Sequence, residues 1–470
     1  MPIRARHVAV AVLSVGCLVG CGGSQEEPPS ASDTTSTTTP TSTGRLEPSS
    51  VSYLGAFRLP GGEDRPASFA YGGSAMTFNP DGAGGAGSLF ISGHDRLAYG
   101  ELPNGSQVAE VTIPTPVVAN GLSGLPRADF IQGFHEVAGN LFQGLDEIPR
   151  LGMLYLNQSG VGPRIHLNWG QHLQDPHATH ALFSPTLDRP APQGPWWVGP
   201  ASLSVYSLTG YLIELPAAWA SANTSDRMIG TGRFRDGGWS GKGPALLAYT
   251  PYSNGSLPAA GARLPATTLL LYASSEDDAA PTHHSMSGYQ HPDEWEGGAW
   301  VTTASGHSAL VFVGTKSEGT KYWYGWQHPG GTNLPCVETE LVSQFTTCWT
   351  EEGTPCGPAD LTGCSGHNDY RGWWTTRFAA QMVFYDPADL ARVAAGTAAS
   401  YEPQPYASLD FDQHLFHNPS GVERDMLGQG VQRRYRIGES AYDRRGNRLY
   451  VLELFADGTK PVVHVFSMGA

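Results

Sequence analysis

Short apolar runs that alternate with polar positions recur along most of this chain, and tight turns separate them. Residues 72–78 lead through the turn Asn79–Gly82 into the apolar run 88–93. Near the end of the chain, Ile437–Tyr442 leads through a second turn into Arg448–Glu453. Alternation with a period of two, interrupted by Asn, Asp and Gly, predicts β-hairpins. The pattern therefore predicts an all-β chain.

A second kind of apolar run is expected to close each hairpin unit as its outermost strand. Examples are Val108–Pro114, Tyr211–Pro216 and Gln381–Pro387. Tyr53–Pro60 has the same character but precedes the first unit, whereas the last unit lacks such a strand. We therefore expect the first strand of the chain to complete the last unit and to leave no open sheet edge.

The pattern over residues 51–470 resembles a β-propeller of five or six irregular blades closed by the N-terminal strand. The resemblance is architectural, since the chain carries no clean WD, kelch or Asp-box signature. A pair of β-sandwich domains is the alternative. A short helix is predicted over 386–393, where Asp386 suits the N-cap and Pro387 the first turn.

The N-terminus carries the features of an export signal. Arg4 and Arg6 precede the apolar run Val8–Gly20, which is shorter than the roughly 20 residues that span a bilayer. Leu18–Cys21 resembles the lipobox of bacterial lipoproteins, which implies that Cys21 is acylated and becomes the mature N-terminus. The next residue is Gly rather than Asp, so the resemblance implies the outer membrane if the host has two. An ordinary secretory signal with an incidental cysteine is the alternative.

Residues 21–50 consist almost entirely of small and polar residues, chiefly Gly, Ser, Thr, Pro and Glu. Such a segment cannot bury enough apolar surface to offset the entropy of ordering, so we expect a disordered tether. Its root-mean-square span would be roughly 30 Å. The predicted organisation is a lipoprotein signal peptide over 1–20, this tether over 21–50 and a propeller-like domain over 51–470.

The remaining cysteines lie close together in the sequence, at Cys336, Cys348, Cys356 and Cys364. An exported protein meets an oxidising compartment, so two disulfides are expected, and their three possible pairings stay open. A zinc site that includes His367 is the alternative, although the spacing lacks the tight Cys-x-x-Cys pairs of common zinc sites. These cysteines fall in an insertion at about 327–378 within one blade, and the disulfides would stabilise this insertion.

Charge and motifs exclude several classes of function. The net charge of −15 repels a phosphate backbone, so nucleic acid is not expected as a partner. The sequence contains no His-Glu-x-x-His, no P-loop, no Gly-x-Ser-x-Gly nucleophile elbow and no complete EF-hand loop. These absences argue against several common enzyme classes.

Histidines and carboxylates near strand starts are the candidate site residues. Blade-opening strands line the central channel of a propeller, and we expect four residues to meet at one mouth of it: His135, Glu136, Glu296 and Glu439. Imidazole and carboxylate groups together bind a divalent metal or act as acid and base. For Glu439 the alternative is a structural role, in which it accepts hydrogen bonds from backbone amides.

Aromatic residues suggest a second candidate site. Trp373 and Trp374 form a candidate aromatic platform, because rigid rings flanked by carboxylates and amides suit carbohydrate. Packing of the two rings within the loop is the alternative. The pair His283-His284 lies in a predicted loop, where a solvated surface position competes with a functional role.

Two classes of function are compatible with this pattern. The first is a binding or scaffold propeller, anchored to the cell envelope by lipid, that meets a glycan or a protein partner. The second is a polysaccharide hydrolase or a metal-dependent lyase that acts at the channel mouth. A hydrolase requires two carboxylates roughly 5–10 Å apart, and the lyase requires converging histidines. Binding is favoured, because no catalytic motif is present and propellers host many unrelated functions.

Overall fold

The structure is a computed structural model that describes residues 44–62, 66–93, 107–139, 141, 150–171, 177–233, 238–252, 255–275, 278, 282–325, 327, 341–342, 345–346 and 372–469. All of these residues fall within the unit Pro40–Ala470. The predicted signal peptide, Cys21, most of the predicted tether and the four clustered cysteines lie outside the described residues.

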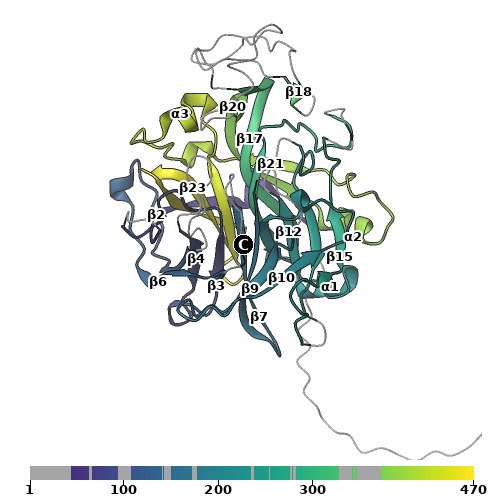
Figure 1. Cartoon of the computed structure of the whole chain (residues 1–470). Coiled ribbons are helices and arrows are strands. Elements are labelled where there is room, and N and C mark those ends of the chain that lie inside the picture. The colour runs from purple at the N-terminus through teal and green to yellow at the C-terminus, as the bar shows by residue number, and fades with distance from the viewer. Residues whose placement is uncertain are drawn as a thin grey trace, which may run out of the picture. The chain divides into compact units, whose positions relative to one another are not determined.

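Five small antiparallel sheets are arranged as a five-bladed β-propeller (Figure 1). From the innermost strand outward, blade 1 contains β3 (Met76–Asn79), β4 (Ser88–Ser92), β5 (Gln107–Thr112) and β6 (Phe130–Glu136). Blade 2 contains β7 (Arg150–Gln158), β8 (Gly162–Gly170), β9 (His180–Phe183), β10 (Gln193–Val198) and the short parallel strand β14 (Arg263–Leu264). Blade 3 contains β11 (Gly210–Glu214), β12 (Ile229–Arg233), β13 (Leu246–Tyr249) and β15 (Ala266–Leu270).

The last two blades contain the longest strands. Blade 4 consists of β16 (Glu294–Thr302), β17 (His307–Gly325), β20 (Gly372–Tyr385) and β21 (Ala407–Asp410), and β1 (Gly44–Arg45) pairs in parallel with β17. Blade 5 consists of β22 (Ile437–Asp443), β23 (Arg448–Asp457), β24 (Lys460–Met468) and β2 (Val51–Arg58). A small separate hairpin is formed by β18 (Leu341–Val342) and β19 (Phe345–Thr346).

Helices are few and short in the described part of the chain: α1 (Ala217–Asn223), α2 (Pro387–Ala394) and α3 (Arg424–Leu427). Single 3-10 turns occur at Pro48–Ser50, Ala83–Gly85, Leu122–Gly124, Val205–Ser207, Asp412–His414 and Gly430–Gln432. Helix α2 confirms the sequence prediction, since Asp386 accepts a hydrogen bond from the backbone N–H of Ala388 and Pro387 occupies the first turn. None of the described helices has the length and apolar character needed to cross a bilayer.

The innermost strands form a closed ring. β3 contacts β7 and β22, β11 contacts β7 and β16, and β16 contacts β22. Each inner strand therefore touches the inner strands of both neighbouring blades. Together the five strands enclose a central channel.

Strands in the middle of a blade are apolar on both faces, because each blade packs between two others. In β23, Leu449 and Val451 belong to the core shared with blade 4, whereas Tyr450 and Leu452 belong to the core shared with blade 1. Successive side chains of a strand point to opposite faces. A strand that is covered on both sides therefore carries a continuous apolar run rather than an alternating one.

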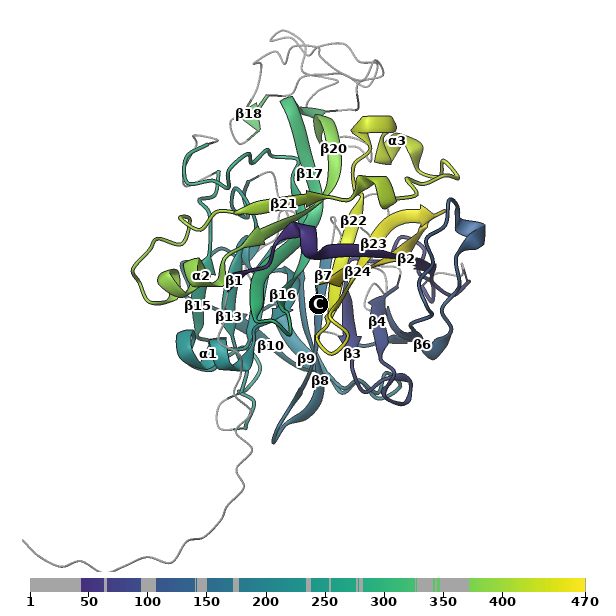
Figure 2. The same ribbon diagram turned by 180° about the vertical axis from the view of Figure 1, so that it is seen from behind.

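The N-terminal strand closes the propeller as the outermost strand of the last blade, which confirms the prediction. β2 pairs antiparallel with β24, and Phe57 lies opposite Val463 (Figure 2). Phe57 is fully buried, and Arg58 adds an ion pair to Asp457 with a nitrogen–oxygen distance of 2.9 Å. Blade 5 is thus built from both ends of the described chain, and the alternative of β-sandwich domains is wrong.

Some predicted strand positions are wrong. The run at Tyr211, predicted as a closing strand, is β11, the innermost strand of blade 3. The runs at Val108 and Gln381 are the third strands β5 and β20, because the short outer strands β6 and β21 follow them. Inner and third strands are both covered on two faces, so their apolar patterns do not distinguish them.

The predicted insertion interrupts blade 4 between two strands that extend past the rest of their sheet. β16 pairs with β17 only as far as Thr315, whereas β17 and β20 stay paired as far as Gly325 and Gly372 (Figure 1). The end of the predicted insertion, residues 372–378, therefore belongs to β20.

Candidate functional site

A buried ion pair spans the central channel at the end where the inner strands begin. Arg150 opens β7 in blade 2, and Glu296 lies near the start of β16 in blade 4. Two guanidinium nitrogens of Arg150 lie 3.2 and 3.3 Å from the carboxylate oxygens of Glu296, and both side chains are buried. Blades 2 and 4 are not neighbours in the ring, so this ion pair links two inner strands that are not adjacent.

Glu439 on β22 lies beside this ion pair and is fully buried. Its Oε1 accepts a hydrogen bond of 2.9 Å from the backbone N–H of Ser440, and its Oε2 has no hydrogen-bond partner among the described residues. Burial raises the pKa of Glu439 well above its ordinary value, and the charge of Glu296 raises it further. Glu439 therefore holds its proton to higher pH than an exposed glutamate does.

The structure brings together Glu296 and Glu439 but places the other two candidate residues of the channel mouth elsewhere. His135 and Glu136 lie on β6, the outermost strand of blade 1, rather than on a blade-opening strand. Glu136 accepts hydrogen bonds from the backbone N–H groups two and three residues ahead. These two residues are therefore not part of the channel cluster, because three strands of their blade separate them from the axis.

The candidate aromatic platform is buried on β20. The exposed fractions of Trp373 and Trp374 are 8% and 0%, which leaves no open ring face for a sugar. The guanidinium carbon of Arg434 lies 4.0 Å from the ring centroid of Trp374, a cation–π contact. Trp373 packs edge-on against His291, with 5.0 Å between ring centroids. The two tryptophans therefore pack the region where β17 and β20 extend beyond β16.

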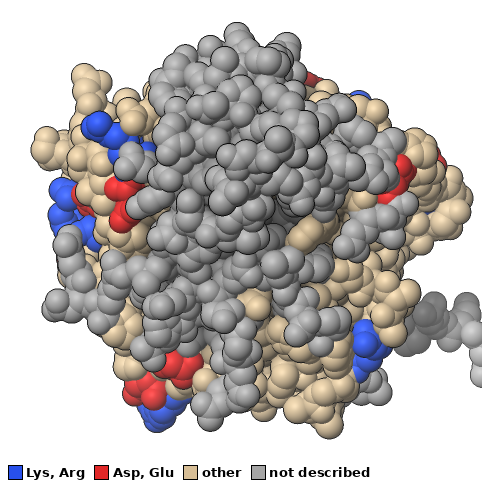
Figure 3. All heavy atoms as spheres, turned by 45° about the horizontal axis from the view of Figure 1, so that its top comes forward, with Lys and Arg blue, Asp and Glu red and all other residues tan. Residues whose placement is uncertain are grey.

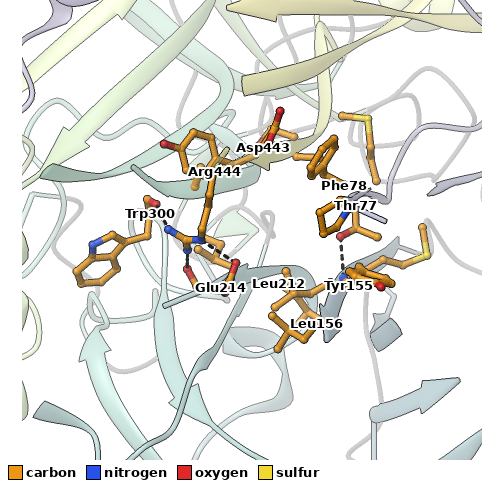
Figure 4. A pocket seen from close by; sticks show the side chains of 18 of the residues that line it. Thr77, Phe78, Tyr155, Leu156, Leu212, Glu214, Trp300, Asp443 and Arg444 are labelled. Atoms are coloured by element: carbon orange, nitrogen blue, oxygen red, sulfur yellow. Dashed lines mark hydrogen bonds and ion pairs between the residues drawn. The ribbon is translucent and has the colours of Figure 1, made fainter. Parts of the chain in front are cut away.

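A cavity of about 310 Å³ occupies the other end of the channel, where the inner strands end (Figure 4). Every inner strand contributes to its lining: examples from β3, β7, β11, β16 and β22 in turn are Thr77, Tyr155, Leu212, Trp300 and Ser440. The volume lies near the lower end of the roughly 300–1,000 Å³ found for small-molecule sites. The cavity therefore suits a small ligand.

Fixed hydrogen bonds hold the polar part of the cavity wall. Arg444 donates to the carboxylate of Glu214 at 2.8 Å and to the backbone oxygen of Trp300 at 3.1 Å (Figure 4). On the other side of the view, the hydroxyl of Thr77 accepts from the backbone N–H of Tyr155 at 2.8 Å. These groups are oriented before any ligand enters, so binding would require little further ordering.

The cavity is balanced in charge and lies beside a buried hydroxyl group. Its ionisable lining residues are two acids and two bases, namely Glu214, Asp443, Arg444 and Arg445. The hydroxyl oxygen of Ser440 is buried and has no hydrogen-bond partner among the described residues. A Cβ atom on Gly297 would touch both this hydroxyl and Oε1 of Glu439, so the cavity wall adjoins the charged cluster.

Among the described residues, one group combines side chains suited to a metal ion. Nδ1 of His283 contacts Oδ2 of Asp278, and Nδ1 of His284 lies 3.3 Å from the same oxygen. The group lies in the connection between β15 and β16, and the two imidazole rings stack with 3.7 Å between centroids. No histidine lines the channel cavity within the described structure, so convergence of histidines there, which a metal-dependent lyase requires, is not observed.

Comparison with known proteins gives no match: no family model matches this chain, and no curated protein is significantly similar to it. Function is therefore inferred from the channel itself.

Arg150 and Ser440 belong to the channel, yet sequence reasoning missed both. The one local sequence feature that points to Arg150 is its position as a single arginine at the start of a largely apolar strand, Arg150–Gln158. Ser440 follows Glu439, and nothing in the local pattern distinguishes it from other strand serines. Their role comes from the ring, which brings the starts and ends of five separate strands together.

Substituting Arg150→Met is expected to destabilise the fold by about 3–5 kcal/mol, because it leaves the buried carboxylate of Glu296 without its cation. The double variant R150M/E296M removes both charges and should recover most of that loss. Urea denaturation of the three proteins measures the effect. Additive losses in the double variant would contradict a direct interaction between the two side chains.

Substituting Glu439→Gln is expected to change how stability depends on pH. The pKa of Glu439 is raised in the folded state, so the folded protein holds a proton that the unfolded chain releases above its ordinary pKa of 4.5. Stability of the wild type relative to E439Q should therefore fall as pH rises above 4.5 and until it passes the folded-state pKa, by up to about 1.4 kcal/mol per pH unit. Denaturation curves of both proteins at matched pH give this difference, and a constant difference would contradict the assignment.

Proposed function

We propose that this protein is an exported lipoprotein, anchored through Cys21, whose propeller binds a small polyhydroxylated ligand such as the end of a glycan. The observation that carries the binding proposal is the cavity of about 310 Å³ to which all five inner strands contribute. A concave site with apolar walls and a few fixed polar groups is the usual form of a small-molecule site. Export and anchoring are supported by the lipobox-like Leu18–Cys21 and the polar segment that follows it.

The chemistry of the cavity wall favours a neutral, hydroxyl-rich ligand. Acidic and basic lining residues are equal in number, so no net charge selects an ion. The carboxylate of Glu214 and the guanidinium of Arg444 offer an acceptor and donors of the kind that sugar hydroxyl groups use. Leu154 and Tyr442, both half-buried, supply apolar surface beside them. Aromatic and polar groups in one small cavity are typical of carbohydrate sites.

Acid–base catalysis on a polysaccharide is the second candidate, and one observation favours it. Glu439 and Glu296 lie together in different environments, since burial raises the pKa of Glu439 and Glu296 is paired with Arg150. Two carboxyl groups in different environments are a common arrangement of acid and base. Both side chains are buried, which favours the binding role, because a substrate would have to reach them through the channel. Release of reducing ends by the wild type, abolished in E439Q, would support this candidate.

Filling the cavity is expected to abolish glycan binding. Leu154 lines the cavity from a half-buried position, so Leu154→Trp adds volume there with limited disturbance of the core. Val118→Trp is the matched control, since Val118 is 68% exposed and does not line the cavity. On a glycan array, ligands retained by the wild type should be retained by V118W and lost by L154W. Equal retention by both variants would place binding elsewhere.

Substituting Cys21→Ser is expected to abolish lipid attachment, because the thiol of this residue is the proposed acylation site. Labelled palmitate supplied to expressing bacteria should enter the wild type and not C21S, and the wild type should partition into detergent. Cys17→Ser is the control, since it leaves the lipobox-like sequence intact and should label normally. Equal labelling of C21S and the wild type would exclude this anchor.

A further inference from the structure

A second cavity, of about 530 Å³, lies at the opposite end of β22 from the channel cavity. The segment between β21 and β22 forms most of it, through the turns Asn418–Gly421 and Gly428–Val431, and β20 completes it. Its charged and titratable lining residues are mostly basic: Arg377, Arg424, Arg433 and Arg436, with His417 and Asp412.

Two of these arginines are already neutralised. Arg436 donates through one nitrogen to both carboxylate oxygens of Asp412, each at 2.9 Å. Arg377 pairs with Glu318 at 3.4 Å and with Asp410 at 3.3 Å. Asp412, the acid within the lining, is therefore committed to Arg436.

Arg433 is buried, at 4% exposure, but makes no ion-pair contact with a described carboxylate. One of its terminal nitrogens donates to the backbone oxygen of Leu454 at 3.1 Å, and its Nε has no acceptor among the described residues. Burial lowers the pKa of Arg433 to about 10, with Arg436 adding to the effect, so the side chain stays charged at neutral pH.

Two acids act on Arg433 from a distance, and both are occupied by other groups: Asp412 by Arg436, and Glu453 by backbone N–H groups and a histidine. Glu453 raises the pKa of Arg433 by its charge. Its two oxygens accept from the backbone N–H groups of Phe416 at 2.8 Å and His417 at 2.7 Å, and it pairs with His464 at 3.0 Å. Glu453 is thus held by its own hydrogen bonds, away from direct contact with the guanidinium.

Arg424 supplies a second cation at the same cavity. Arg424 is exposed, lines the cavity, and has no ion pair with any described residue. Figure 3 shows Lys and Arg atoms and Asp and Glu atoms in small separate groups on the described part of the face that it draws, not one broad basic field. The excess of positive charge is therefore local to the cavity.

We propose that this cavity binds the oxyanion group of a small ligand, a carboxylate, sulfate or phosphate, through Arg433 at its inner side and Arg424 at its rim. A buried guanidinium without a carboxylate in direct contact is costly, and an anion that enters the cavity lowers that cost. The forked N–H groups of arginine match the oxygens of all three anions. This site is independent of the neutral-ligand cavity in the channel.

Thermal unfolding of the full chain with added sodium sulfate, phosphate or glucuronate, at ionic strength matched with sodium chloride, tests the proposal. At least one anion should raise the melting temperature in a saturable manner. Response to glucuronate alone would identify a carboxylate ligand, and response to sulfate or phosphate alone a tetrahedral one. No saturable rise with any of the three would overturn the proposal.

Two variants separate the site from general salt effects. Arg424→Gln changes an exposed side chain, so the fold should survive, and the apparent affinity should fall about tenfold with the loss of one charged contact. Arg189→Gln is the matched control, because the Arg189 side chain is 82% exposed and lies outside the cavity. Equal anion responses in R424Q and R189Q would overturn the proposal.

Discussion

The pairing of β2 with β24 is the constraint on which the rest of this structure depends. The channel exists only while five inner strands touch in a ring, and the ring is complete only when the last blade holds its place beside the first. Phe57 opposite Val463 fixes that blade with a strand from the other end of the chain. Closing such a long loop costs little more entropy than closing a moderately long one, because the cost grows slowly with length. Burial of Phe57 and the ladder of strand hydrogen bonds then stabilise the closure.

The closed ring gives the two ends of the channel different chemistry. At the starts of the inner strands, Arg150 and Glu296 meet across the axis, and Glu439 lies beside them with a raised pKa. Buried ion pairs are seldom a large net source of stability, but they strongly disfavour arrangements in which either partner is left alone. We infer that this pair fixes the positions of blades 2 and 4 relative to each other. The ends of the same strands leave a cavity whose polar groups are already oriented.

The segment before β22 shows how neighbouring residues of one type come to differ. Arg434 stacks on Trp374, Arg436 pairs with Asp412, and Arg433 keeps its charge without a carboxylate in contact. The three side chains lie within four positions of each other in the sequence and are all buried. Their separate surroundings come from β20, from the turns of the preceding segment and from β23. The different chemical roles of these three arginines are therefore set by how they pack and not by residue type.

The sequence by itself determined the local elements. Period-two runs with Asn, Asp and Gly turns specify hairpins such as β22–β23, and Asp386 with Pro387 specifies the start of α2, because these signals act within a few residues. The unmatched strand at Tyr53 also indicated closure of the ring. Only the tertiary structure decided which strand is innermost, since alternation reports how the faces are covered and not the order of strands in a blade. Because strand order was not readable from the sequence, His135 was expected at the channel but lies on the outermost strand of its blade. Arg150 and Glu296 are 146 positions apart in the sequence, and their contact exists only once the ring has closed.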